Sequence, residues 1–227
     1  MNTAKRFFQS SLGKKYIMAL TGFALFAFVV VHMAGNLQIF LGPKAINDYA
    51  FFLKSNPGLL WGARAGLLLV AALHIISAFQ LVRANRRARP SGYNEYKVVA
   101  ASLGARTIVV SGLIILAFII YHLLHFTLGV TNPEYMTLAD PADPLRHDVY
   151  RMMIKGFSNV WVSAFYIIAM GLLCLHLSHG VTSMFQSLGL RRKAITRSIN
   201  LFARAAAIVV FLGNVAIVVA VLTGFVK

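Results

Sequence analysis

Cysteine and acidic side chains are both scarce in this sequence, and each shortage narrows what the protein can be. Cys174 is the only cysteine, so no disulfide can form within the chain. Asp and Glu number 6 against 22 Lys and Arg, which gives a formal net charge of +16. Yet only 12% of residues are charged and 59% are hydrophobic. A soluble domain cannot bury so much apolar surface, so we predict an integral membrane protein with no nucleic-acid partner.

Long apolar segments define the expected fold. A helix needs about 20 apolar residues to cross roughly 30 Å of hydrocarbon, and five segments meet that length. They lie near residues 16–40, 60–82, 105–129, 158–187 and 203–225. The first is too long for a signal peptide and is predicted to be a retained helix. We expect an all-α integral membrane protein with one domain, residues 1–227, and no internal repeat. The longest loop, 130–157, is expected to contain turns and a short surface helix.

The charge is divided unevenly between the two sides of the predicted membrane domain. The side of the N-terminus has fifteen basic residues and one acid, Glu95, whereas the other side holds the remaining acids. By the positive-inside rule, the N-terminus is expected in the cytoplasm and the C-terminus outside, in the inner (cytoplasmic) membrane of a cell. The basic surface is suited to anionic lipid and to an acidic soluble partner. Its residues are Lys5, Arg6, Lys14, Lys15, Arg83, Arg86, Arg87, Arg89, Lys97, Arg106, Arg191, Arg192, Lys193, Arg197 and Arg204.

Four of the apolar segments each carry a histidine at membrane depth, namely His32, His74, His122 and His176. An ionisable side chain inside hydrocarbon is costly and indicates a functional site. At about 1.5 Å per residue, His32 and His122 lie about 25 Å from the cytoplasmic ends of their helices. The other two are expected nearer the cytoplasm. Two histidines at each level predict two bis-histidine haem b sites within a bundle of the first four helices, and with a single cysteine the haem is non-covalent.

Several neighbours of these histidines are candidate haem surroundings. Residues three or four positions away share the face of a helical histidine, and small ones let a flat porphyrin approach. The alternative is that they serve only helix packing. His147, beside Asp148 in the outer loop, is expected to be ordinary surface. The candidate surroundings are Gly35, Asn36, Ser77, Gly180 and two further histidines, His125 and His179, which are placed to contact a haem propionate or a quinone.

Two histidine motifs resemble a known family. The segment FVVVHMAGNLQIF contains His32 and Asn36, and HLSHGVTSMFQSLG begins with His176. They resemble the cytochrome b membrane subunit of succinate dehydrogenase/fumarate reductase, in its single-chain, five-helix, di-haem form. That family has asparagine four residues after the first ligand and glycines four and thirteen residues after the last, as Gly180 and Gly189 are here.

The same resemblance selects the ligand in the third helix. The family has a glycine ten residues before an aromatic–histidine pair, which Gly112, Tyr121 and His122 match. It therefore implies His122 and His176 as axial ligands rather than His125 and His179. No loop glutamate matches the one that some quinol-oxidising members use, so the resemblance does not carry over a quinone site.

The resemblance implies a place in respiratory Complex II. A flavoprotein subunit and an iron–sulfur subunit exchange electrons with succinate or fumarate, and this chain relays them through haem to a membrane quinone, menaquinone in the five-helix form. The dicarboxylate chemistry itself lies outside this chain. Two alternatives are the cytochrome b subunit of a formate dehydrogenase or hydrogenase, and a transporter that uses histidines as a proton relay.

Overall fold

The computed structural model describes residues 10–88 and 103–227. Five of its helices are long and apolar enough to cross a membrane, which confirms the all-α, multi-pass fold class. Five charged residues considered above lie outside the described residues, namely Lys5, Arg6, Arg89, Glu95 and Lys97.

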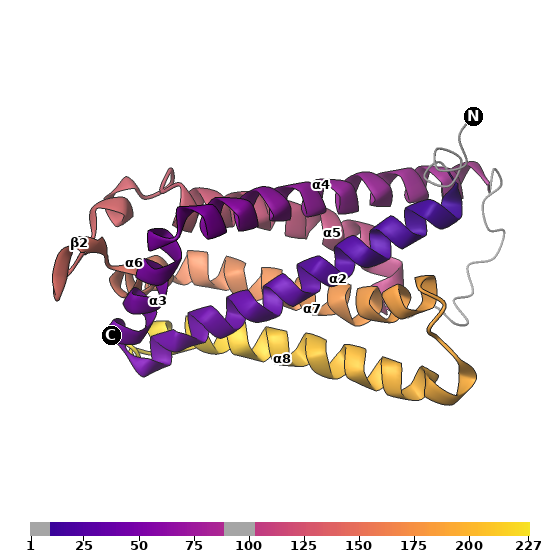
Figure 1. The fold of residues 1–227 in the computed structure, drawn as a ribbon. Coiled ribbons are helices and arrows are strands. Elements are labelled where there is room, and N and C mark those ends of the chain that lie inside the picture. The colour runs from indigo at the N-terminus through magenta and orange to yellow at the C-terminus, as the bar shows by residue number, and fades with distance from the viewer. Residues whose placement is uncertain (1–9, 89–102) are drawn as a thin grey trace.

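The five long helices run side by side along one axis (Figure 1). Local signals set several of their ends. The Ser10 side chain caps the first helix at the Gly13 amide, 3.0 Å away, and Asn159 caps the fourth at the amides of Trp161 and Val162. Pro57 occupies the first turn of the second, where its missing N–H is not needed. The helices are α2 (Ser11–Asn36, extended by a 3₁₀ turn over Leu37–Leu41), α4 (Pro57–Arg87), α5 (Leu103–His122, extended by a π turn over Leu123–Thr127), α7 (Val160–Ser187) and α8 (Thr196–Leu222).

Shorter elements form a cap at the end of the bundle where the chain terminates in Lys227 (Figure 1). The loop 130–157 contains the expected short helix, α6, and also a small hairpin. Helix α3, which follows α2, was not predicted. The cap elements are α3 (Pro43–Ser55), a 3₁₀ turn (Pro133–Thr137), the antiparallel strands β1 (Ala139–Asp140) and β2 (Asp143–His147), and α6 (Val149–Phe157).

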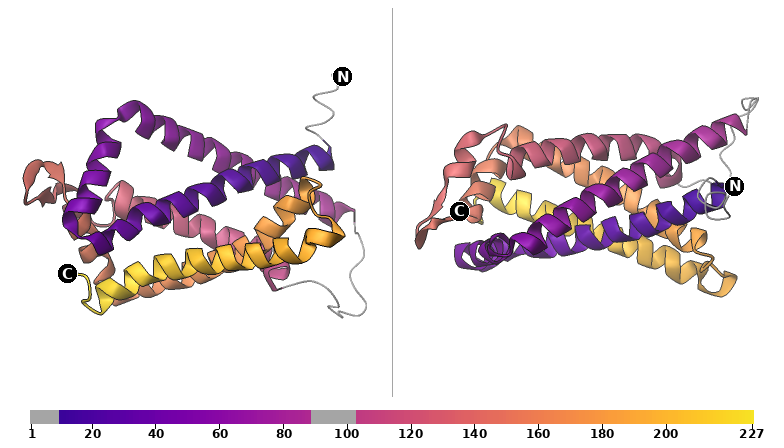
Figure 2. Two further views of the ribbon diagram at one scale, coloured as in Figure 1. Left: turned by 60° about the horizontal axis from the view of Figure 1, so that its bottom comes forward. Right: turned by 45° about the horizontal axis from the view of Figure 1, so that its top comes forward.

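The packing of the long helices is uneven. Close backbone contacts join α2 to α4, α5 to α7, α2 to α7, and α8 to both α7 and α2, and Figure 2 shows the same arrangement from two further sides. The most deeply buried side chains at the α8 contact are small: Ala203 and Ala207 have no exposed surface. Small residues allow helices to approach closely in a membrane, where burial of apolar surface gives no drive to associate. In contrast, α2 and α5 have little direct backbone contact, and neither do α4 and α7.

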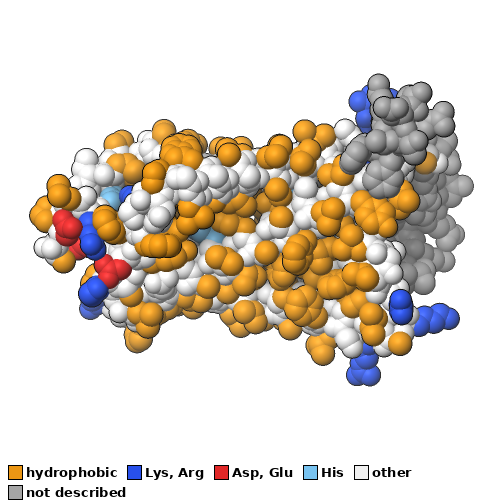
Figure 3. Space-filling view, in the orientation of Figure 1, with side chains coloured by type: hydrophobic (Ala, Val, Ile, Leu, Met, Phe, Trp, Pro, Cys, Tyr) orange, Lys and Arg blue, Asp and Glu red, His pale blue; other side chains and the backbone are white. Residues whose placement is uncertain are grey.

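Charged side chains gather at the two ends of the molecule, with an apolar band between them (Figure 3). We call the end that holds the start of α2, the close of α4 and the α7–α8 connection the basic end. Every described acidic residue lies instead in the cap, on α3, on the β1–β2 hairpin or next to these elements: Asp48, Glu134, Asp140, Asp143 and Asp148.

Candidate functional site: two histidine pairs inside the helix bundle

The structure brings His32 of α2 and His122 of α5 together, and we call them the outer pair. Their ring centres are 5.8 Å apart and the rings are nearly perpendicular, at 85°. Two imidazoles that bind one metal ion have ring centres about 6 Å apart, because each metal–nitrogen bond is about 2 Å and each nitrogen lies about 1 Å from its ring centre. Phe28 stacks on His32 and Phe118 stacks on His122, one turn away in each helix. The outer pair thus bridges two helices that barely touch each other.

Tyr166 of α7 lies between two histidines of the third long helix. Its hydroxyl is 3.3 Å from Nδ1 of His122 and 3.1 Å from Nδ1 of His125. His125 sits in the π turn after α5 and is only 1% exposed, against the ring of Phe126. It is therefore an interior hydrogen-bonding group rather than a side chain near the water. His32 differs from His122, because its Nε2 contacts Nδ2 of Asn36 at 3.1 Å.

The inner pair consists of His74 on α4 and His176 on α7. Each of them contacts a hydroxyl of the preceding long helix. Nδ1 of His74 is 3.1 Å from the Thr21 hydroxyl of α2, and Nδ1 of His176 is 3.3 Å from the Ser111 hydroxyl of α5. Each contact crosses between helices that pack closely, so it fixes the direction of the imidazole.

A glycine follows each of these hydroxyl residues and leaves room for the imidazole. A Cβ at Gly22 would lie 3.3 Å from Cε1 of His74, and one at Gly112 would lie 3.4 Å from Cε1 of His176. Both are closer than most side-chain contacts, so any larger residue would press on the ring. Gly112 was predicted from its spacing to His122, and the structure places it against His176 instead.

These contacts share one sequence spacing. Thr21-Gly22 precedes His32 as Ser111-Gly112 precedes His122, with the glycine ten residues before the histidine in both cases. In both cases the hydroxyl residue contacts the histidine of the following long helix. The hairpins α2–α4 and α5–α7 are therefore alike at this contact. Thr21, Gly22 and Ser111 were missed, although this shared spacing is visible in the sequence.

The remaining candidate residues occupy different surroundings. A Cβ at Gly35 would lie 2.8 Å from the ring of Tyr49, so this glycine accommodates α3. Ser77 is buried, at 4% exposure, whereas no atom lies within 4 Å of a Cβ built at Gly180, one turn after His176. His179 contacts the Ser183 hydroxyl at 3.0 Å through its Nε2.

His147 is not the ordinary surface residue that we expected. It is half-buried in the cap, with Nδ1 3.1 Å from the Leu138 carbonyl and Nε2 3.4 Å from the sulfur of Met152. Burial is the main cause that lowers its pKa below the usual 6.5, and the charge of Lys54 acts in the same direction.

The histidine pairs still have exposed surface inside the apolar band. His32 is exposed and the other three are half-buried. Histidine surface is visible in a recess of this band (Figure 3). Within 10–88 and 103–227, no three His, Cys, Asp or Glu side chains are grouped to hold a bare metal ion. The macrocycle of a haem supplies the other ligands of its iron, so two imidazoles complete the site, and the 5.8 Å between the rings of His32 and His122 fits this use.

Comparisons with protein families, curated proteins and solved structures find no match for this chain.

Proposed function

We propose that this chain is a di-haem cytochrome b that anchors a succinate dehydrogenase or fumarate reductase complex in the membrane. The observation that supports it most is the outer pair, His32 and His122, whose ring centres lie 5.8 Å apart across two helices with little contact of their own. The resemblance of the motifs around His32 and His176 favours this complex over other cytochrome b enzymes.

The chain's own residues would orient and tune two haem b groups. The outer pair, His32 and His122, would bind one haem iron, and the inner pair, His74 and His176, the other. Haem supplies one-electron redox chemistry when bound, and the protein tunes it through burial and hydrogen bonds to the axial ligands. Asn36 would have to release Nε2 of His32, because that atom is its present contact.

The basic end would dock the soluble subunits. Within the described residues this end has many exposed cations and no acid, so its field would attract an acidic iron–sulfur subunit. The inner pair lies toward this end, since His176 is eleven residues from the close of α7 at Ser187. A partner docked there would exchange electrons with the inner site first. In this proposal, the basic end faces the cytoplasm, the flavoprotein binds through the iron–sulfur subunit, and the quinone is menaquinone.

The first test counts haems and assigns them to the pairs. Pyridine haemochrome analysis of the purified protein should give two protohaems per chain. His32→Ala and His122→Ala should remove the same spectral component in a redox titration, and His74→Ala and His176→Ala should remove the other. His147→Ala is the matched control, because this histidine lies in the cap and should leave both components. One haem or none, or loss of a single component in both His32→Ala and His74→Ala, would contradict the pairing.

The second test concerns the complex. The protein should co-purify with a flavin-containing subunit that oxidises succinate. Co-purification with a formate- or hydrogen-oxidising subunit would refute the Complex II assignment and leave the cytochrome b assignment in place.

A further inference from the structure

The hydroxyl groups of Thr21 and Ser111 contact Nδ1 of His74 and of His176, at 3.1 Å and 3.3 Å. A hydroxyl has one proton to donate and two lone pairs that accept. Thr21 donates to the Ile17 carbonyl at 2.6 Å, and Ser111 donates to the Ile108 carbonyl at 3.2 Å. A hydroxyl whose proton is used in this way accepts from the histidine, so Nδ1 of His74 and Nδ1 of His176 would carry the hydrogen.

A neutral imidazole with its hydrogen on Nδ1 has a bare lone pair on Nε2, on the far side of the ring. In this tautomer, Nε2 of both inner histidines would be free to bind a metal ion.

The outer pair is arranged differently. His122 shares the Tyr166 hydroxyl with His125, and this hydroxyl can donate to only one of the two. His32 has no Ser or Thr contact of this kind in the described structure and touches Asn36 instead. Within the described residues, a hydroxyl that donates to a backbone carbonyl therefore contacts both members of the inner pair and neither member of the outer pair.

On the basis of the function proposed above, we propose that Thr21 and Ser111 are positioning residues of the inner haem site, which preset its two ligands as Nδ1–H imidazoles. Each belongs to a helix that also carries an outer ligand, eleven residues further along. A hydrogen bond that accepts from Nδ1–H makes the imidazole a stronger donor to the metal and favours the ferric state. Its loss should raise the midpoint potential of the inner component and leave the outer one unchanged.

The experiment compares Thr21→Val and Ser111→Ala with the rescuing variants Thr21→Ser and Ser111→Thr. The control is Thr107→Val, since this hydroxyl of α5 donates to the Leu103 carbonyl at 2.8 Å and contacts no histidine. We expect each hydroxyl-free variant to shift the ferric-to-ferrous ratio of the inner component by up to tenfold, which is about 59 mV for a one-electron couple. The rescuing variants and Thr107→Val should keep the wild-type potential. Loss of the inner haem in Thr21→Val together with its retention in Thr21→Ser would also support the proposal.

A second measurement needs no haem. Nitrogen-15 NMR of the haem-free full chain in detergent should find His74 and His176 with the hydrogen on Nδ1. The proposal would be overturned if the NMR spectrum placed the hydrogen on Nε2. It would also be overturned if Thr21→Val and Ser111→Ala left the haem potentials unchanged, or if they shifted the potentials of both haem components equally. Failure of the proposed function is a separate result, because it would appear as a wild-type protein that binds no haem while the NMR tautomers still stand.

Discussion

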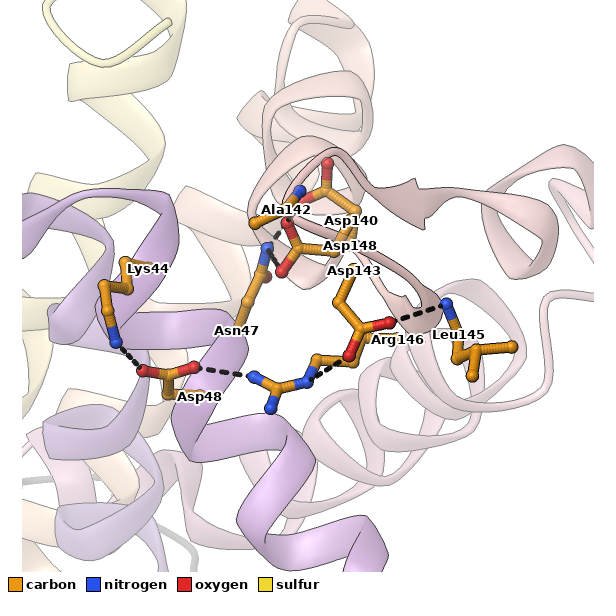
Figure 4. Close-up of polar contacts among 9 residues, drawn as sticks. All are labelled: Lys44, Asn47, Asp48, Asp140, Ala142, Asp143, Leu145, Arg146 and Asp148. Carbon is orange, nitrogen blue, oxygen red and sulfur yellow. Dashed lines mark hydrogen bonds and ion pairs between the residues drawn. The ribbon is translucent and has the colours of Figure 1, made fainter.

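Asn47 of α3 holds the cap together, and its removal should open the cap without disturbing the histidine pairs. Nδ2 of Asn47 donates to Asp140 and to Asp148, each at 3.1 Å (Figure 4). Its Oδ1 accepts from the Tyr150 amide at 3.0 Å. Asn47 and Asp148 are both only 1% exposed. One side chain therefore joins α3 to the β1–β2 hairpin and to the first turn of α6.

The expected magnitude for Asn47→Ala follows from these three bonds. Two hydrogen bonds to charged groups at about 1.5 kcal/mol each and one neutral bond at about 1 kcal/mol give a loss of about 4 kcal/mol. Both carboxylates keep another partner, because Asp140 still accepts from the Ala142 amide and Asp148 from the Arg151 amide. We therefore expect a net loss of about 3 kcal/mol, which raises the opening equilibrium of the cap on the order of 100-fold.

The assay is limited trypsin digestion of the protein in detergent, at low protease, where the cleavage rate follows the population of the open form. Arg146 and Arg151 are the sites to monitor within the cap. Asn56→Ala is the matched control, since Asn56 follows the last residue of the same helix, is exposed, and donates from its side chain to Phe52 and Ser55 of that helix. Equal cleavage rates for Asn47→Ala and Asn56→Ala would refute the reasoning, and so would loss of the haem components in Asn47→Ala.

Three further predictions concern other parts of the chain. Gly156→Ala should lower the melting temperature more than Gly213→Ala, because overpacking costs typically about 1–3 kcal/mol. A Cβ at position 156 would lie 2.6 Å from the ring of Phe126, which is packed against other aromatic rings. A Cβ at position 213 would meet the flexible side chain of Met33, which can move away. The pKa of His147 is lowered in the folded cap, so the unfolded chain binds more protons than the folded one as pH falls below 6.5. The cap should therefore become less stable, and trypsin should cleave it faster, as pH falls through 6.5. This increase should be smaller in His147→Gln. Reversing the charge of Arg86 and Arg87 should release the soluble subunits at moderate salt and leave both haem components in place, whereas a salt-resistant complex would mean that these residues only set topology.

The five membrane helices could be predicted from the sequence because hydrocarbon thickness dictates the length of an apolar run. Helix α3 could not be found in this way. It has only 13 residues and lies in the cap, and its bounds depend on Pro43 and on the Asn56-Pro57 step rather than on hydropathy. Asn47 was missed for a related reason, since its partners are about 100 positions away in the chain and come close only when the loop 130–157 folds over α3.

The candidate site was also only partly readable from the sequence. The depth of each histidine follows from its position in a helix, and these depths predict one level for His32 and His122 and another for His74 and His176. The partners of the imidazoles depend on which helices are neighbours, and periodicity carries no such information. Thr21 and Ser111 each look like a small polar residue at a helix contact until α4 and α7 are placed beside them.

The spacing between each hydroxyl residue and the next histidine explains how one helix can serve both levels. Thr21 and His32 are eleven residues apart, as are Ser111 and His122, and eleven residues make about three turns of a helix, so both side chains leave on nearly the same face. The same interval spans about 16 Å, roughly half of the hydrocarbon thickness. In the proposed function, a helix with this spacing would contribute to both imidazole levels, with a hydroxyl at one and a ligand at the other. A shift of one residue would turn one of the two side chains by about 100° and take it away from its histidine partner.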